Sequence, residues 1–82
     1  MEYKIRFKPR AIKDGKSIDK ARLKLIFSKI GLLSDNLQGD VKKLTNATHE
    51  YRLRVGDYRV LFETDKDEVI IYRIMHRREA YR

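Results

Sequence analysis

Residues 51–62 read YRLRVGDYRVLF, and this stretch decides the fold of the chain. Apolar and polar side chains alternate on both sides of Gly56-Asp57, and a period of two places the two sets on opposite faces of a strand. A two-residue loop that begins with glycine is typical of a hairpin, because glycine accepts the positive φ that such a turn requires. We therefore predict a β-hairpin in which Arg54 lies opposite Arg59. The rest of its register pairs Val55 with Tyr58, Leu53 with Val60, Arg52 with Leu61 and Tyr51 with Phe62.

The predicted hairpin has one apolar and one basic face. The apolar face, expected to be core, consists of Tyr51, Leu53, Val55, Tyr58, Val60 and Phe62. The basic face carries Arg52, Arg54 and Arg59. A solvated outer face is the ordinary explanation of charges on an antiparallel sheet, and general experience favours it. However, a solvated face would mix charges of both signs, whereas three planar guanidinium groups suit the oxygens of phosphate.

Composition limits the classes of function. The chain has 82 residues, no cysteine and a net charge of +8, from 20 basic and 12 acidic residues. We expect one domain over residues 1–82, with neither disulfides nor a thiolate metal site, and two scattered histidines do not indicate zinc. No stretch is long and apolar enough to be a signal or membrane segment, so we expect a soluble, cytoplasmic protein. A basic surface indicates nucleic acid or an acidic protein as the partner, and charge alone does not decide between them.

The residues before the hairpin predict a strand and two helices. Tyr3, Ile5 and Phe7 alternate with charged residues, and a short helix follows from Pro9 to Asp14, closed by Gly15. A second helix, capped by Ser17 or Asp19, carries an apolar stripe at three- and four-residue spacing. The stripe consists of Leu23, Ile26, Phe27, Ile30 and Leu33. The adjoining Leu25 and Leu32 widen it; we expect them to pack under the first helix, and the alternative is that this side of the helix meets another surface.

The remaining segments complete a sheet. Residues 34–48 are predicted to be largely loop, and residues 69–75 (VIIYRIM) are apolar at both parities, as in an interior strand. The order is thus β-α-α-β-β-β. The predicted class is α+β, a mostly antiparallel four-stranded sheet with two N-terminal helices packed on one face, which leaves the arginine face open.

The residue types restrict the chemistry of that face. Asp65, Asp67 and Glu68 lie together in a turn, where solubility explains them better than magnesium binding. No nucleophilic triad or glycine-rich phosphate loop is visible. What remains is metal-free RNA cleavage, in which the 2′-hydroxyl of the substrate attacks the adjacent phosphate with the help of a base, cations and an acid. Arginine supplies only the cations. Tyr81 and His76 are candidates for proton transfer, although a tail anchor and a hydrogen-bonded strand-end histidine are the favoured interpretations from the residues alone.

Three segments resemble one family. KKL at residues 42–44, YRLRVGDYRVLFE at 51–63 and IIYRIMHRREAYR at 70–82 resemble the RelE branch of the RelE/ParE toxin superfamily. The resemblance covers essentially the whole chain. It implies a RelE-like toxin of a type II toxin-antitoxin system, a metal-independent endoribonuclease that cleaves mRNA in the ribosomal A site. It also implies an acidic antitoxin as partner, alongside ribosome and mRNA, and no cofactor.

The resemblance also implies site residues. The expected catalytic set is Arg52, Arg54, Arg59, Arg77 and Tyr81, and the expected RNA-binding set is Arg52, Arg54, Arg78, Lys42 and Lys43. Members of the family can have lysines where Arg52 and Arg54 stand, so the assignment of the general acid and base stays open. Two alternatives also remain: a ParE-like poison of DNA gyrase, and a non-catalytic module whose arginine face binds an acidic helix.

Overall fold

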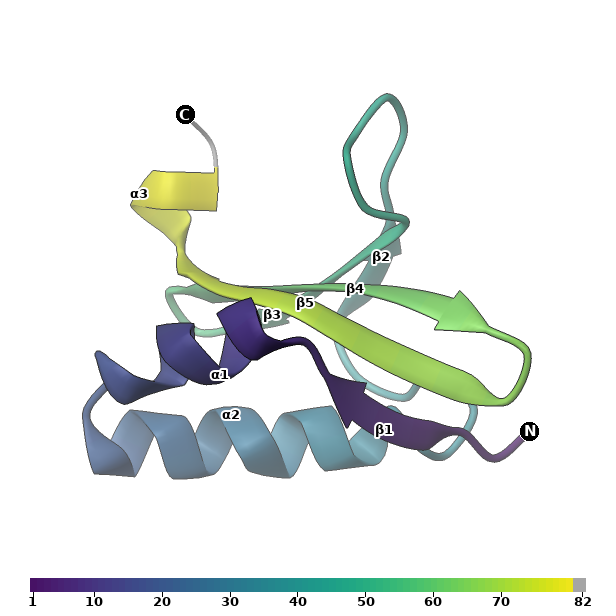
Figure 1. Cartoon of the computed structure of the whole chain (residues 1–82), viewed down its shortest axis with the longest axis horizontal. Coiled ribbons are helices and arrows are strands. Elements are labelled where there is room, and N and C mark those ends of the chain that lie inside the picture. The colour runs from purple at the N-terminus through teal and green to yellow at the C-terminus, as the bar shows by residue number, and fades with distance from the viewer. Residues whose placement is uncertain (81–82) are drawn as a thin grey trace.

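The computed structural model describes residues 1–80 as a five-stranded sheet with two helices on one face (Figure 1). The strands lie in the order β1-β5-β4-β3-β2, and only β1 and β5 pair in parallel. The predicted α+β class is confirmed. The elements are β1 (Lys4–Phe7), α1 (Pro9–Lys16), α2 (Lys20–Leu32), β2 (Val41–Lys43), β3 (Tyr51–Val55), β4 (Tyr58–Asp65), β5 (Glu68–His76) and α3 (Arg77–Ala80).

The hairpin β3–β4 has the predicted register. Arg54 pairs with Arg59, and Tyr51 pairs with Phe62 at the far end. Gly56 has a φ of 57°, as the turn requires. Because antiparallel partners share a face, this register places all six predicted apolar residues of the hairpin toward the helices.

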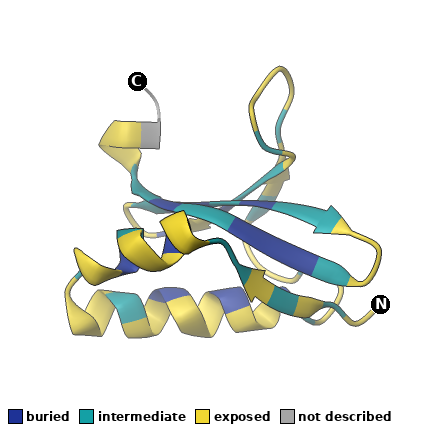
Figure 2. Ribbon diagram, viewed as in Figure 1, coloured by how far each residue is buried: buried dark blue, intermediate teal, exposed yellow. Residues whose placement is uncertain are grey.

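The core lies between the sheet and the two helices (Figure 2). Its fully buried side chains come from both layers, and the largest are Phe62, Ile26, Ile30, Leu33, Leu53, Ile71, Val60 and Val69. The strand β5 occupies an interior position between β1 and β4, as its apolar sequence predicts. Burial of a side chain of this size contributes about 1.5–3 kcal/mol, so these residues supply much of the stability.

The helices differ from the prediction at two points. Gly15 does not close α1 but lies within it, buried, where a Cβ would be 3.4 Å from Leu23 Cδ1. A Cβ at this distance would make an ordinary van der Waals contact with α2, and α1 ends one residue later, at Lys16. Of the two predicted caps for α2, Asp19 is the one used, because its carboxylate accepts a hydrogen bond from the backbone N–H of Arg22.

The structure confirms the predicted apolar stripe of α2 only in part. Ile26, Ile30 and Leu33 are buried, but Phe27 is 46% exposed and makes an edge-to-face contact with Phe7. Leu25 and Leu32 are exposed rather than packed under the first helix, so that prediction is wrong. The physical reason is that α1 is short and lies beside α2 (Figure 1), and thus covers only part of the apolar arc.

The predicted loop over residues 34–48 contains a strand. β2 pairs antiparallel with β3, with Lys42 opposite Arg52, and this fifth strand was not expected. Before it, Gly39 has a φ of 127° and lies against Leu53, where a Cβ would be 3.0 Å from Leu53 Cδ1. The left-handed backbone at Gly39 and the close approach to the core together favour glycine at this position.

Two segments rise from the sheet on the side away from α1 and α2 (Figure 1). One is the connection between β2 and β3, and the other is α3, which follows β5 directly. The basic face of the hairpin lies on this same side, which we call the open face.

Candidate phosphate-binding face

The predicted arginines lie on the open face, since their neighbours Leu53, Val55 and Val60 belong to the core. Arg54 and Arg59 are cross-strand partners, as predicted. Arg52 lies in the next row, between Lys42 of β2 and Leu61 of β4. The structure therefore brings four of the predicted basic residues together: Lys42, Arg52, Arg54 and Arg59.

An acidic residue that the sequence analysis did not consider neutralises part of this face. Asp40, just before β2, accepts a hydrogen bond of 2.7 Å from Arg54 Nε and lies 3.5 Å from Arg52 Nη1. The hydrogen bond from Arg54 and the charges of both arginines lower the pKa of Asp40, against a smaller effect of desolvation. The open face thus carries charges of both signs, and the expectation that it carries guanidinium groups alone is wrong on this point.

Arg59 is buried, which the prediction of an open arginine face did not anticipate. Only 7% of the residue is exposed, and its Nη1 donates to the carbonyl oxygens of Gly56 and Tyr58, at 2.9 and 3.0 Å. The side chain turns back along its own strand toward the hairpin turn. These contacts to the turn fix the direction of its guanidinium group.

The residues after β5 lie beside the hairpin turn. The backbone N–H of Arg77 donates to the carbonyl oxygen of Asp57 at 2.7 Å, and this bond ties the start of α3 to the loop of the hairpin. Arg77 and Arg78 are both exposed. The predicted catalytic Tyr81 lies outside the described residues. Lys43 pairs with Tyr51 and so has the parity of the core face, away from the other predicted RNA-binding residues.

Two further polar residues of the open face were missed. His49 Nδ1 lies 3.0 Å from Glu63 Oε2, and the imidazole ring packs on Tyr72 with a centroid distance of 4.6 Å. The side chain of His49 is 15% exposed. It lines a hollow of about 400 Å³ whose other walls are Leu44, Ala47, Thr48, Leu61, Arg73 and Met75. Only its tertiary partners distinguish His49, and these are not visible in the local sequence.

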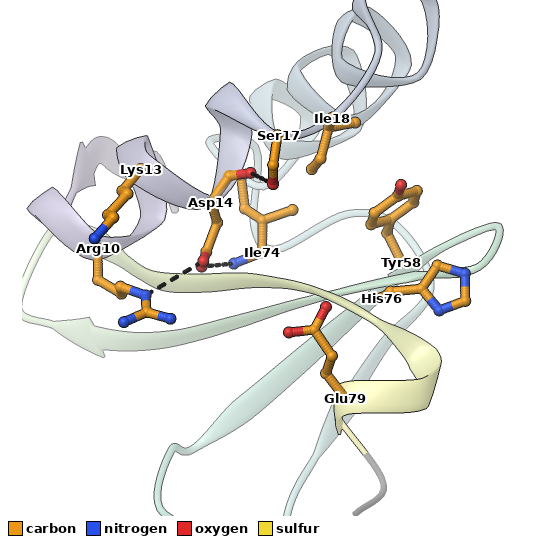
Figure 3. A pocket seen from close by; sticks show the side chains of 9 residues that line it. All are labelled: Arg10, Lys13, Asp14, Ser17, Ile18, Tyr58, Ile74, His76 and Glu79. Atoms are coloured by element: carbon orange, nitrogen blue, oxygen red, sulfur yellow. Dashed lines mark hydrogen bonds and ion pairs between the residues drawn. The ribbon is translucent and has the colours of Figure 1, made fainter.

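A second polar hollow of about 360 Å³ lies beside the same C-terminal half of β5 but is lined by Ile74 and His76, against α1 and α3 (Figure 3). Its central residue is Asp14, whose carboxylate accepts hydrogen bonds from Arg73 Nε at 2.8 Å and from the backbone N–H of Ile74 at 3.0 Å. Burial raises the pKa of Asp14, but these two hydrogen bonds and the charge of Arg73 outweigh it and hold the pKa below its usual value. The carboxylate is therefore a structural link between α1 and β5.

The helices carry an exposed apolar surface. Ile12, Leu25, Phe27 and Leu32 each expose more than two-fifths of their area. Ile12 and Phe27 also line an almost purely apolar hollow of about 280 Å³ between α1 and α2. We call these four residues the apolar helix patch. Leu25 and Leu32, seven residues apart on α2, share one side of that helix, whereas Phe27 lies on another side with Ile12, and exposed apolar residues of this kind can mark a protein interaction site.

Residues 1–80 lack two features, a cluster of metal ligands and a membrane-spanning helix. Residues 1–80 bring no three side chains of His, Asp or Glu close enough together to hold a metal ion. No helix within the same residues has the length and hydropathy to cross a membrane.

Comparison with known proteins identifies the class. The family model described as the ParE toxin of the type II toxin-antitoxin system, parDE, matches residues 5–81. Together with the RelE-like sheet and helices, this match shows that the chain belongs to the RelE/ParE superfamily of type II toxin-antitoxin toxins. The resemblance found in the sequence is thereby confirmed.

The individual relatives are RelE proteins. The chain is 34% identical over 84 residues to toxin RelE3 of Methanocaldococcus jannaschii, an alignment that covers 95% of this chain and 94% of the relative. It resembles the crystal structure of a RelB-RelE antitoxin-toxin complex from Methanococcus jannaschii, with 31% identity, a TM-score of 0.77 and coverage of 93% and 94%. It also resembles the RelBE2 toxin-antitoxin complex of Mycobacterium tuberculosis, with 26% identity, a TM-score of 0.81 and coverage of 93% and 99%.

Proposed function

We propose that this toxin is a ribosome-dependent endoribonuclease that cleaves mRNA in the A site and so inhibits translation. The observation that carries the proposal is the group of arginines on the open face, together with the likeness to RelE toxins. Guanidinium groups bind phosphate oxygens in pairs and stabilise the charge that develops during phosphoryl transfer. The cytoplasm, where ribosomes and mRNA occur, is the corresponding location.

The proposed reaction needs no metal ion. The 2′-hydroxyl of the substrate attacks the adjacent phosphate, and the 5′-oxygen leaves. Arg59 and Arg77 act on the scissile phosphate, whereas Arg52, Arg54, Arg78 and Lys42 bind the flanking RNA. Tyr81 transfers a proton or holds the 2′-hydroxyl in line for attack. The direction of the Arg59 guanidinium, set by its bonds to the hairpin turn, supports a positioned rather than a mobile phosphate contact.

A mapping experiment tests this function. Purified toxin is added to translating ribosomes, and the 5′ ends of the mRNA are mapped with and without it. We expect new ends in the A-site codon. We expect Arg59→Ala to lower the rate by about 10²–10³-fold, by analogy with the loss of one oxyanion donor. Tyr81→Phe retains the ring and removes only the hydroxyl group. If it cleaves at the parent rate while Tyr81→Ala fails, Tyr81 is an anchor.

Poisoning of DNA gyrase is the second candidate, and the description of the matching family model as a ParE toxin favours it. If mRNA stays intact while the parent, Arg59→Ala and both Tyr81 variants remain equally toxic, the ribonuclease proposal fails. Trapping of cleaved plasmid DNA by gyrase in the presence of the toxin then supports the ParE-like alternative.

The proposed partner is a RelB-type antitoxin with an acidic, amphipathic segment. Two solved relatives are toxin-antitoxin complexes, the RelB-RelE complex and the RelBE2 complex. The net charge of +8 favours an acidic partner, and the apolar helix patch offers it an apolar contact. An amphipathic helix laid along α2 covers Leu25 and Leu32, which share one side of α2, and leaves its acidic side for the neighbouring lysines of α2.

A further inference from the structure

The open face carries a histidine and a carboxylate in the arrangement of a general base and its orienting group. His49 precedes β3 and Glu63 lies on β4, and their Nδ1 and Oε2 atoms are 3.0 Å apart. An ionised carboxylate accepts hydrogen bonds but cannot donate them, so the proton of the neutral imidazole resides on Nδ1. The lone pair of Nε2 is then available to accept a proton.

His49 Nε2 has no hydrogen-bond partner among residues 1–80, although the ring itself is held on two sides. Glu63 fixes its edge, and Tyr72 packs against its face. A ring held in this way has one orientation, which a reaction that needs an aligned proton acceptor requires.

His76, the histidine that the sequence analysis considered for proton transfer, has the opposite arrangement. Its Nδ1 accepts a hydrogen bond of 3.3 Å from the backbone N–H of Arg78. A backbone amide can only donate, so the neutral ring carries its proton on Nε2. Nε2 of His76 is therefore a donor, and His49 is the histidine whose Nε2 presents a lone pair.

The position of His49 relates it to the arginines. Leu61 and Met75 line the same hollow as His49. Leu61 is the cross-strand partner of Arg52, and Met75 is that of Arg59. Glu63 and Leu61 are two residues apart on one face of β4, which separates them by about 7 Å, roughly the span of one nucleotide. The hollow that His49 lines is therefore adjacent to Arg52 and Arg59 on the sheet, within reach of a nucleotide next to a phosphate bound by Arg52.

We propose that His49, oriented by Glu63, is the general base that activates the 2′-hydroxyl; this inference rests on the proposed ribonuclease function. His49 Nε2 takes the proton of the 2′-hydroxyl, and the 2′-oxygen forms a bond to phosphorus. The bond from phosphorus to the 5′-oxygen breaks, and that oxygen takes a proton from water. The products are a 2′,3′-cyclic phosphate and a 5′-hydroxyl, and the imidazolium returns its proton to solvent. Glu63 is a positioning residue, because it acts only through the ring.

Cleavage by His49→Asn tests the proposal. The asparagine amide retains a donor near the position of Nδ1 for Glu63 but has no group at the position of Nε2. Single-turnover cleavage of ribosome-bound mRNA should slow by about 10²–10⁴-fold, the usual contribution of a general base, while ribosome binding and the melting temperature stay near those of the parent. Thr45→Ala, an exposed change in the same loop, is the matched control and should cleave at the parent rate.

Chemical rescue separates catalysis from a purely structural role. Added imidazole should restore cleavage by His49→Ala in proportion to its unprotonated form, whereas it cannot replace a contact that only holds the loop. If the parent cleaves, two results would each overturn the inference about His49 but not the proposed function. One is a His49→Asn rate within about threefold of the parent, and the other is a His49→Ala rate that imidazole leaves unchanged. A parent toxin that leaves mRNA intact overturns the proposed function, and the inference with it.

Discussion

The carboxylate of Asp14 should contribute about 2–3 kcal/mol to stability. It is 10% exposed and accepts hydrogen bonds from Arg73 and from the backbone N–H of Ile74. Asp14→Ala leaves both donors without their acceptor. Hydrogen bonds to a charged group contribute about 1.5–3 kcal/mol each, and the value for Arg73 is reduced because water reaches its side chain, which is 24% exposed. A domain of this size loses about 4–8 °C in melting temperature per kcal/mol, so we expect a fall of about 8–24 °C.

The pH dependence of this effect has a definite sign. Since the pKa of Asp14 is lower in the folded protein than its ordinary value of 3.8, the carboxylate stabilises the fold at pH values above 3.8. Its contribution is lost as the pH falls through the lowered pKa of the folded state. The difference in melting temperature between parent and Asp14→Ala should therefore be full at neutral pH and shrink in strong acid.

Thermal unfolding followed by circular dichroism measures both effects. Asp65→Ala is the matched control: this exposed carboxylate has no side-chain partner among the described residues, and its removal should change stability by less than about 0.5 kcal/mol. If Asp14→Ala melts within about 2 °C of the parent at neutral pH, or if the difference grows in acid, the link between α1 and β5 does not stabilise the fold as argued.

Three other changes have definite expected outcomes. Asp40→Asn should raise the affinity for a short single-stranded RNA, measured by fluorescence anisotropy, because it releases the guanidinium groups of Arg52 and Arg54. The slope of log affinity against log salt concentration should become steeper by about 0.7 for each added phosphate contact. Unchanged binding would mean that Asp40 does not compete with phosphate. Gly39→Ala should lower the free energy of unfolding in urea by about 1–3 kcal/mol, since alanine is strained at a φ of 127° and its Cβ meets Leu53; equal stability would contradict the strain. Leu25→Asp should weaken antitoxin binding, measured by calorimetry, at least about tenfold. Raising the salt concentration from about 0.1 to 0.5 M should weaken the binding further. If neither change alters the affinity, the antitoxin binds another surface.

The pairing of the hairpin could be predicted residue by residue because the features that determine it lie within residues 51–62. Alternation fixes the face of each side chain, and the glycine-led turn fixes the register, so Arg54 and Arg59 were placed as cross-strand partners. The three-residue strand β2 could not be found in this way. It is too short to show a period, and it is a strand only because β3 offers it an edge.

The environment of the candidate site depends on contacts between distant residues. Asp40 reaches Arg54 across 14 positions of sequence, and His49 reaches Glu63 across the same separation. The alternation of apolar and polar residues predicted the correct face of the sheet for Arg59. Its burial could not be predicted, because it results from the way the side chain folds back on the hairpin turn. Local patterns therefore predicted which residue types share the open face, whereas their pairing required the tertiary structure.

The place of β5 in the sheet sets the order in which this toxin can become active. β1 is synthesised before the other strands, but its partner is β5. The pairing of Lys4 with Glu68 can therefore form only after β5 has been synthesised. β5 is also the second neighbour of β4, so until β5 is made the chain can form only the three-stranded part β4-β3-β2 of the sheet. Contacts of such long sequence separation form late, because the loop they close must be ordered first. The open face of a nascent chain therefore stays incomplete until β5 has emerged from the ribosome, whereas the two helices are already synthesised.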